Sequence, residues 1–228
     1  MAAIILAAGE GKRMGLGFNK VLVPLGGKPL LAHTLTIWQE AEGIDEVVVV
    51  TGQKDVEEVR KLVTRFGFQR ITGVLEGGKT RQESAYKGLI HLKKSGPEVV
   101  LIHDGARPFI TSEQVQRLAE AVRRHGAATL AVPVKDTLKK VVGDQVSTTV
   151  DRSDLWAAQT PQGFQYSLIL EAHEKAAAQG LKATDDAQLV ERLGHPVHIV
   201  LGSSTNIKVT TPDDLDLALA ILQRGVRE

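Results

Sequence analysis

The stretch AAIILAAGEGKRMGLGFNK, residues 2–20, decides the fold of this chain. After Ala2 come six apolar residues, Ala3 to Ala8, and then Gly9. An apolar run of this length that ends at glycine is typical of a fully buried strand, because a helix would usually be longer. The sequence therefore predicts a buried strand that ends at Gly9.

The loop after this strand combines glycines with cations. Glycines at positions 9, 11, 15 and 17 permit positive φ and close approach of the backbone to a ligand. Lys12, Arg13 and Lys20 add positive charge, and backbone N–H groups in such a loop can surround anionic oxygens. The loop is therefore a candidate polyphosphate site at the carboxyl end of a strand, where open α/β sheets bind ligands. The alternative is a glycine-rich turn whose basic side chains are simply solvated.

Two familiar phosphate motifs are absent from this stretch. A dinucleotide fingerprint would need a third glycine at position 14, which is Met14, and the stretch contains no G-x-x-x-x-G-K-[ST]. The candidate site is therefore of another type.

Strand and helix patterns alternate along the rest of the chain, which is the signature of an α/β fold. Apolar runs predict further strands at 46–50, 69–74, 98–102, 127–132 and 197–201. Helices are expected at 29–42, 55–66, from about residue 80 to 94, at 111–125, 166–179 and 185–193, and from residue 212 onwards. Thr111 with Gln114 and Thr211 with Asp214 are expected to cap two of them.

Composition excludes several classes of protein. The 228 residues are 43% hydrophobic and 24% charged, which is ordinary for a globular protein, and we expect one domain over 1–228. A net charge of +1 provides no general attraction for nucleic acid. The chain has no cysteine, which excludes disulfides and thiolate nucleophiles. No run is long enough for a signal peptide or a membrane span, so we expect a cytoplasmic protein without nucleic-acid or membrane partners.

A second motif, Gly73 to Thr80, satisfies the P-loop pattern. It keeps open the hypothesis of a P-loop kinase. However, Val74 and Leu75 are apolar where a phosphate loop is normally small and polar, and the motif would leave the first glycine loop without a function. The other interpretation makes 77–84 a loop that enters a helix, with Thr80 or Ser84 as its cap.

The strand at 98–102 is expected to be central and to present His103 and Asp104 at its carboxyl end. A carboxylate opposite a phosphate loop suits Mg²⁺, which prefers one or two carboxylates together with substrate phosphates and water. Asp104 is therefore the predicted metal ligand. His103 has no second histidine at metal-ligand spacing, so we expect a structural role for it.

An arm is predicted where the alternation stops. Residues 139–142 and 146–150 are apolar-rich runs around Gly143-Asp144, which indicates a β-hairpin. A lone hairpin cannot bury its apolar side. We therefore expect the arm, residues 136–153, to pack on a second subunit of a homodimer.

Several motifs carry a resemblance to a known family. LAAGEGKRMG with Asn19-Lys20 resembles the signature of nucleotidyltransferases that join an NTP to a phosphorylated small molecule, although Pro-Lys is usual there. The string H-D-x-A-R-P at 103–108 is similar to cytidylyltransferases that act on methylerythritol phosphate or ribitol phosphate. The motifs at 135–137, 151–152 and 206–210 favour the methylerythritol phosphate cytidylyltransferase family.

This resemblance implies an open, mostly parallel Rossmann-like sheet and the transfer of CMP from CTP to 2-C-methyl-D-erythritol 4-phosphate, with release of pyrophosphate. It implies that the arm of one subunit supplies an arginine to its partner's site. The implied nucleotide-binding residues are Ala7, Ala8, Gly9, Gly11, Gly78, Arg81, Ser84, Asp104 and Gly105. The implied acceptor-binding residues are Asp104, Arg107, Thr137, Arg152, Thr184 and Lys208, with Lys208 on a short strand. The expected catalytic residues are Arg13, Lys20, Arg152 and Lys208.

The chemistry expected from these residues needs no enzyme nucleophile. The chain has no cysteine and no G-x-S-x-G elbow. A phosphate monoester is largely dianionic at neutral pH and can attack the α-phosphorus of an NTP directly. The site then has to supply alignment and cations. A ribitol-5-phosphate cytidylyltransferase, the P-loop kinase and a non-catalytic sugar-nucleotide binding module remain as alternatives.

Overall fold

Strand β1 (Ala2–Ala7) is buried along its whole length, as the apolar run predicts. Its side chains alternate between two hydrophobic clusters. Ala3 and Ile5 belong to one cluster, and Ala2 and Ile4 belong to the other. Because successive side chains of a strand point to opposite faces, helices must cover both faces of the sheet.

The sheet around β1 has seven strands in the order β11-β7-β10-β6-β1-β4-β5. Strand β10 is antiparallel to its neighbours β6 and β7, and the other pairs are parallel. The expected mostly parallel α/β sheet is confirmed. The remaining strands are β4 (Glu46–Thr51), β5 (Ile71–Glu76), β6 (Val99–Asp104), β7 (Ala127–Pro133), β10 (Trp156–Gln165) and β11 (His198–Leu201).

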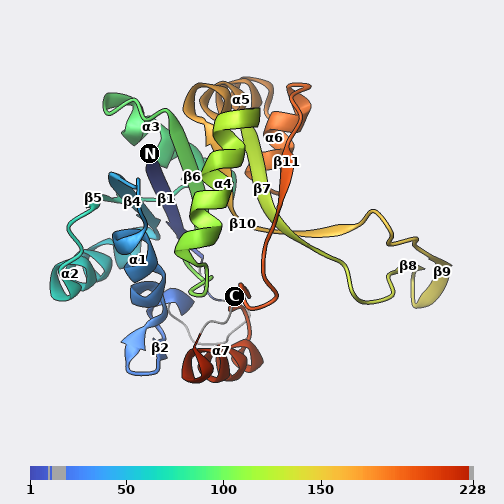
Figure 1. The fold of residues 1–228 in the computed structure, drawn as a ribbon, viewed down its shortest axis with the longest axis horizontal. Coiled ribbons are helices and arrows are strands. Elements are labelled where there is room, and N and C mark those ends of the chain that lie inside the picture. Colours follow the sequence, from blue (N-terminus) through green and yellow to red (C-terminus); the bar gives the residue numbers. More distant parts are fainter. Residues whose placement is uncertain (10, 12–18, 226–228) are drawn as a thin grey trace.

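The structure is a computed structural model that describes residues 1–9, 11 and 19–225 (Figure 1). One face of the sheet packs against α1 (Leu30–Glu40), α2 (Val56–Phe66), α4 (Ser112–His125) and α7 (Pro212–Arg224). The other face packs against α3 (Arg81–His91), α5 (Tyr166–Gln179) and α6 (Asp186–Arg192). Short 3₁₀ turns η2 (Lys20–Leu22), η3 (Gln53–Asp55) and η4 (Leu92–Lys94) and a small ladder of β2 (Pro24–Leu25) with β3 (Lys28–Pro29) complete the core. Among the described residues, no helix combines the length and apolar character that a membrane span requires.

The chain order places a switch point between β1 and β6. From β1 the sheet first grows through β4 to β5, and then the chain returns to add β6 on the other side of β1. Leu6 pairs with Asp104 in the register of these strands, so both carboxyl ends open at the same edge. Open α/β sheets bind ligands in the crevice at such a point.

The predicted hairpin is present and stands apart from the core. Strands β8 (Lys139–Val142) and β9 (Gln145–Thr149) form a separate two-stranded ladder, and Figure 1 shows them projecting away from the helices. Val141, Val142 and Val146 are each more than half exposed. In a single chain this apolar surface is therefore not buried.

Two expected caps are confirmed, and two strand predictions are wrong. Thr111 with Gln114 and Thr211 with Asp214 form complete capping boxes at α4 and α7. Strand β5 begins at Ile71 and continues to Glu76, because it pairs with β4 as far as Thr51. Lys208 does not lie in a strand; its segment is loop, connected to the core by the bond from the Val209 N–H to the Ala106 carbonyl, at 2.9 Å.

His103 is a buried part of this scaffold. Its Nε2 donates to the Arg107 carbonyl at 3.0 Å, and its Nδ1 accepts from the Thr160 hydroxyl at 3.1 Å. The Thr160 oxygen accepts in turn from the Asp104 N–H at 3.0 Å, which leaves the hydroxyl hydrogen for His103. This arrangement requires neutral imidazole with its proton on Nε2, and burial lowers the pKa of His103 to about 4.

Acid should therefore destabilise the protein through His103. The unfolded chain binds a proton here near pH 6.5, whereas the folded chain does so only near pH 4. Stability from this group is complete above pH 6.5 and is lost as the pH falls towards 4, by about 2 kcal/mol between pH 7 and pH 5. Urea unfolding at the two pH values measures the loss. His103→Gln has no ionisable group at this position and should show a correspondingly smaller loss, whereas an equal loss in the variant would contradict this assignment.

Candidate active site

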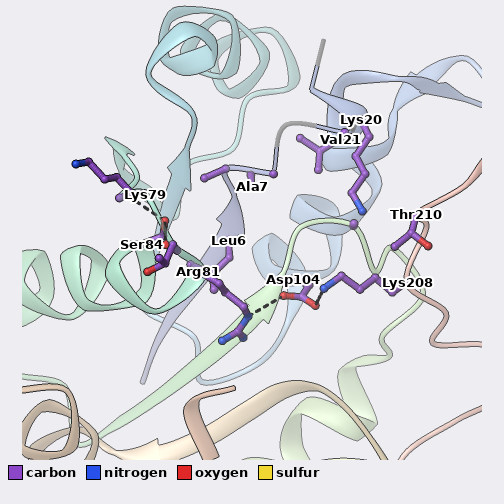
Figure 2. Close-up of a pocket in the computed structure, with 16 residues that line it drawn as sticks. Leu6, Ala7, Lys20, Val21, Lys79, Arg81, Ser84, Asp104, Lys208 and Thr210 are labelled. Carbon is purple, nitrogen blue, oxygen red and sulfur yellow. Dashed lines mark hydrogen bonds and ion pairs between the residues drawn. The ribbon is translucent and has the colours of Figure 1, made fainter. Parts of the chain in front are cut away.

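A cleft of about 580 Å³ opens at the carboxyl ends of β1 and β6, at the switch point (Figure 2). Its size falls within the range of small-molecule sites. The segment after β1, the start of α3, the end of β6 and the loop before α7 all contribute to its wall. The described residues that line it include Leu6, Ala7, Ala8, Gly9, Gly11, Lys20, Gly78, Arg81, Ser84, Asp104, Ala106, Lys208 and Thr210.

Asp104 lies at the centre of this cleft and is almost completely buried. Lys208 Nζ lies 2.7 Å from its Oδ2, and Arg81 Nε lies 3.5 Å from its Oδ1. Figure 2 shows these two cations approaching the carboxylate from opposite sides. A third cation, Arg107, has its Nε 3.8 Å from the same Oδ2 of Asp104. Burial alone would raise the pKa of Asp104, but Lys208 and Arg81 hold it well below its usual value, so the carboxylate stays charged.

The donor set around Asp104 fits one divalent cation that is shared with a substrate. Among the described residues, Asp104 is the only carboxylate that lines the cleft, and they contain no group of three or more metal-binding side chains. Mg²⁺ commonly binds one or two carboxylates and takes its other ligands from phosphates and water. Each carboxylate oxygen can accept more than one contact, so the ion pairs do not exhaust Asp104.

Lys20 connects the end of the first loop to the opposite wall of the cleft, and Asn19 stabilises the turn before it. Lys20 is 9% exposed and donates from Nζ to the Val209 carbonyl at 2.7 Å. Asn19 donates from Nδ2 to the Ala7 carbonyl at 2.7 Å and to Asp55 at 2.9 Å, and its Oδ1 accepts from the Val21 N–H. Its φ of −66° is also the value that proline would impose. Hydrogen bonds therefore hold this turn in a conformation that proline would also adopt.

The start of α3 forms a second wall. Thr80 is the N-cap, with its side chain accepting from the Glu83 N–H. Ser84 has a different role: its Oγ accepts from the Gly78 N–H at 3.0 Å and donates to the Thr80 carbonyl at 2.9 Å. A Cβ on Gly78 would lie 2.2 Å from that of Glu83. Only glycine therefore fits at position 78.

Gly105 is also constrained by close packing. Its N–H donates to the Leu6 carbonyl at 2.8 Å, which joins the ends of β6 and β1. A Cβ here would lie 3.1 Å from Leu31 and 3.2 Å from the Leu6 oxygen. Any side chain at position 105 would therefore crowd Leu31 and the backbone at the end of β1.

Four of the sequence-predicted acceptor residues do not line the cleft of their own chain. Arg107 is largely buried behind Asp104 and donates to the Asn206 carbonyl at 2.6 Å. Thr137 and Arg152 are exposed at the base of the arm. Thr184 is exposed before α6, whose N-cap is Asp185. Arg13 lies outside the described residues.

Asp186 contacts a residue of the cleft although no sequence motif singles it out. An acid in the first turn of a helix commonly complements the helix dipole, yet the side chain of Asp186 is 1% exposed and lies 2.6 Å from Arg81 Nη1. His173 Nε2 lies 3.2 Å from its other oxygen. No spacing motif links these residues, because α3, α5 and α6 come together only in the folded chain.

Known proteins resemble this chain over nearly its whole length. The family model for 2-C-methyl-D-erythritol 4-phosphate cytidylyltransferase matches residues 1–224. Relatives of that name from Halalkalibacterium halodurans and Geobacillus kaustophilus are 47% and 49% identical, each over 99% of this chain and 98% of the relative.

Solved structures show the same likeness. The 4-diphosphocytidyl-2C-methyl-D-erythritol synthase of Anaerococcus prevotii has a TM-score of 0.86 and 34% identity, covering 98% of this chain and 96% of that chain. The 2-C-methyl-D-erythritol 4-phosphate cytidylyltransferase of Thermus thermophilus has a TM-score of 0.80 and 37% identity, covering 96% and 98%. A family model over nearly the whole chain, relatives that are almost half identical and solved structures of the same fold together show that the chain belongs to the 2-C-methyl-D-erythritol 4-phosphate cytidylyltransferase family.

Proposed function

We propose that this protein transfers CMP from CTP to 2-C-methyl-D-erythritol 4-phosphate, giving 4-diphosphocytidyl-2-C-methyl-D-erythritol and pyrophosphate in the non-mevalonate route to isoprenoids. The observation that carries the proposal is that Lys208 and Arg81 pair with Asp104 in the same cleft that Lys20 lines. The names of the relatives supply the identity of the two substrates. The cytoplasmic location stays a prediction.

The reaction is a displacement at phosphorus. An oxygen of the acceptor phosphate forms a bond to the α-phosphorus of CTP, and the bond from that phosphorus to the bridging oxygen of the β-phosphate breaks. The electron pair leaves with pyrophosphate, and no proton has to be removed from a dianionic acceptor. The protein therefore has to bring two anions together and stabilise the charge that moves to the leaving group.

We assign the nucleotide to the β1 side of the cleft. The backbone at Ala7, Ala8, Gly9 and Gly11 would face the triphosphate, and Lys20 would stabilise the α-phosphate and the leaving pyrophosphate. Gly78, Arg81 and Ser84 would contact the cytidine, with Asp104 and Gly105 beside it. Arg13 is proposed to assist Lys20 from the loop outside the described residues.

We assign the acceptor phosphate to Lys208, whose side chain is 39% exposed and reaches into the cleft from the opposite wall. Arg107 lies behind the cleft, so it would act mainly through its contacts with Asp104 and with the Asn206 carbonyl. Thr184 and Thr137 are proposed to border the acceptor once both substrates and a second subunit are present.

A Mg²⁺ ion is the proposed cofactor, and Asp104 would hold it. Such an ion supplies positive charge to the phosphates during the displacement. Asp104 also keeps Lys208 in place by their 2.7 Å ion pair, so the same carboxylate orders the cation that faces the acceptor.

The arm is the proposed dimer contact. Its exposed valines need a partner surface, and Arg152 lies at its base, outside the cleft of its own chain. We therefore propose that Arg152 of each subunit enters the cleft of the other and binds the acceptor phosphate there.

The competing hypotheses have less support. Gly73 to Glu76 lie inside strand β5, so the P-loop pattern has no loop around its first four residues. Lys79 is one of the residues that line the cleft, but it is exposed, and Figure 2 shows its side chain pointing away from Asp104. Ribitol 5-phosphate remains the acceptor to compare, because the CTP half of the site would serve either polyol.

Pyrophosphate release provides the test of function. With four NTPs and both polyol phosphates, we expect turnover only with CTP and 2-C-methyl-D-erythritol 4-phosphate in the presence of Mg²⁺. Lys20→Ala should lower kcat by about 100- to 1,000-fold, because one preorganised charge at the reacting phosphate is lost. Lys79→Ala is the matched control and should retain near-normal activity. Normal turnover by Lys20→Ala, or loss with Lys79→Ala, would reject the assignment.

Mixed dimers test the shared site. Lys20→Ala and Arg152→Ala proteins, each nearly inactive alone, should regain about one quarter of wild-type activity when subunits exchange equally, since half the dimers then hold one intact site of two. Mixing Lys20→Ala with Lys208→Ala should restore nothing, because both lysines line the cleft of the same chain. No restoration in the first mixture would place Arg152 elsewhere, whereas restoration in the second would show that Lys20 and Lys208 do not act in the same site.

A further inference from the structure

A buried carboxylate lies behind the wall of the cleft that α3 forms. Asp186, the first residue of α6, accepts from Arg81 Nη1 at 2.6 Å through Oδ2. Its Oδ1 lies 3.2 Å from His173 Nε2, and the side chains of both Asp186 and His173 are 1% exposed. Arg81 is 105 residues away in the sequence, so this contact joins two distant segments.

Hydrogen bonds to the backbone at the start of α6 fix the position of Asp186. Gln162 Oε1 accepts from the N–H groups of Asp186 and Ala187, at 3.0 and 3.1 Å. Gln162 Nε2 donates to Asp185 at 2.8 Å, and Asp185 already caps the helix. The start of α6 is therefore anchored to strand β10, and the helix does not need Asp186 as a cap.

Arg81 is shared between two carboxylates. Its Nη1 contacts Asp186, while its Nε lies 3.5 Å from Asp104 in the cleft. A guanidinium presents its donors in a rigid fork, so binding one carboxylate sets the direction of the others. Without Asp186, attraction would draw Arg81 onto Asp104, the carboxylate that the proposed function assigns to the metal.

We propose that Asp186 is a positioning residue: it holds Arg81 against the wall of the cleft in the orientation that binds CTP, and it keeps Arg81 from pairing fully with Asp104. This inference rests on the proposed function, because it assigns Arg81 to the nucleotide. His173 completes the support by occupying the second oxygen of Asp186, and it stacks on Tyr86 of α3 at 5.9 Å between ring centres.

The charge state of Asp186 agrees with this role. Burial alone would raise the pKa of its carboxyl, but Arg81 and the hydrogen bond from His173 lower it below the usual value. The carboxylate is therefore ionised and can hold a guanidinium by charge as well as by hydrogen bonding.

Asp186→Asn tests the proposal, because asparagine keeps the shape and removes the charge, while its Oδ1 can still accept one hydrogen bond from Arg81. We expect the KM for CTP and the Kd for CTP with Mg²⁺, measured by titration calorimetry, to rise about 10- to 100-fold, as when a residue supporting a metal ligand is removed. The KM for the acceptor should change less than about twofold, while Asp186→Glu should recover much of the CTP affinity. A merely structural role would lower activity for both substrates together, and unchanged CTP binding would overturn the proposal.

A second comparison remains decisive if Asp186→Asn fails to fold. Replacing both members of a buried pair is better tolerated than removing one, so Arg81→Met is compared with the Arg81→Met/Asp186→Asn double variant. Once Arg81 is gone, losing Asp186 should not weaken CTP binding further. An additional loss in the double variant would overturn the proposal. Because calorimetry reads CTP binding alone, it would still decide this if the wild-type protein showed no turnover with the proposed acceptor.

Discussion

The buried carboxylate of Asp104 is the constraint on which the rest of the site depends. A charge in this position is costly unless cations surround it. Lys208 and Arg81 approach it from opposite sides, with Arg107 behind. Lys208 comes from the loop before α7 and Arg81 from the start of α3, so one anion holds two walls of the cleft together. Because cations outnumber carboxylates among the described residues that line the cleft, this part of its wall is suited to an anionic ligand.

The sheet places this charge cluster where a ligand can reach it. Strands β1 and β6 are buried on both faces, and the order of the strands reverses between them. Their carboxyl ends cannot be covered by the connecting helices, because the chain leaves in opposite directions on the two sides. The hydrogen bond from the Gly105 N–H to the Leu6 carbonyl joins the carboxyl ends of β6 and β1, and the cleft opens beyond these ends. The arm has no comparable support in the core, which is why we propose it as the dimer contact.

Sequence patterns predicted the elements with strong local signals. Helix α5 spans Tyr166–Gln179 as expected, and Thr211, Pro212 and Asp214 begin α7 as predicted. The pattern was less reliable where pairing sets the bounds: β5 is two residues later than expected because β4 determines how far it extends. Asp186 lies in the first turn of α6, where an acid commonly complements the helix dipole, so no local pattern indicates its contact with Arg81.

By itself, the sequence determined the buried β1 strand, the glycine loop, the α/β order, the capped helices, the arm and the family. Each of these depends on residues that are neighbours along the chain. Only the tertiary structure decided which distant groups form ion pairs or hydrogen bonds with one another. Lys20 meets the Val209 carbonyl across 189 positions, Arg81 meets Asp186 across 105, and Thr160 supports both His103 and Asp104. Such contacts arise because packing brings together elements whose order in space no local periodicity records.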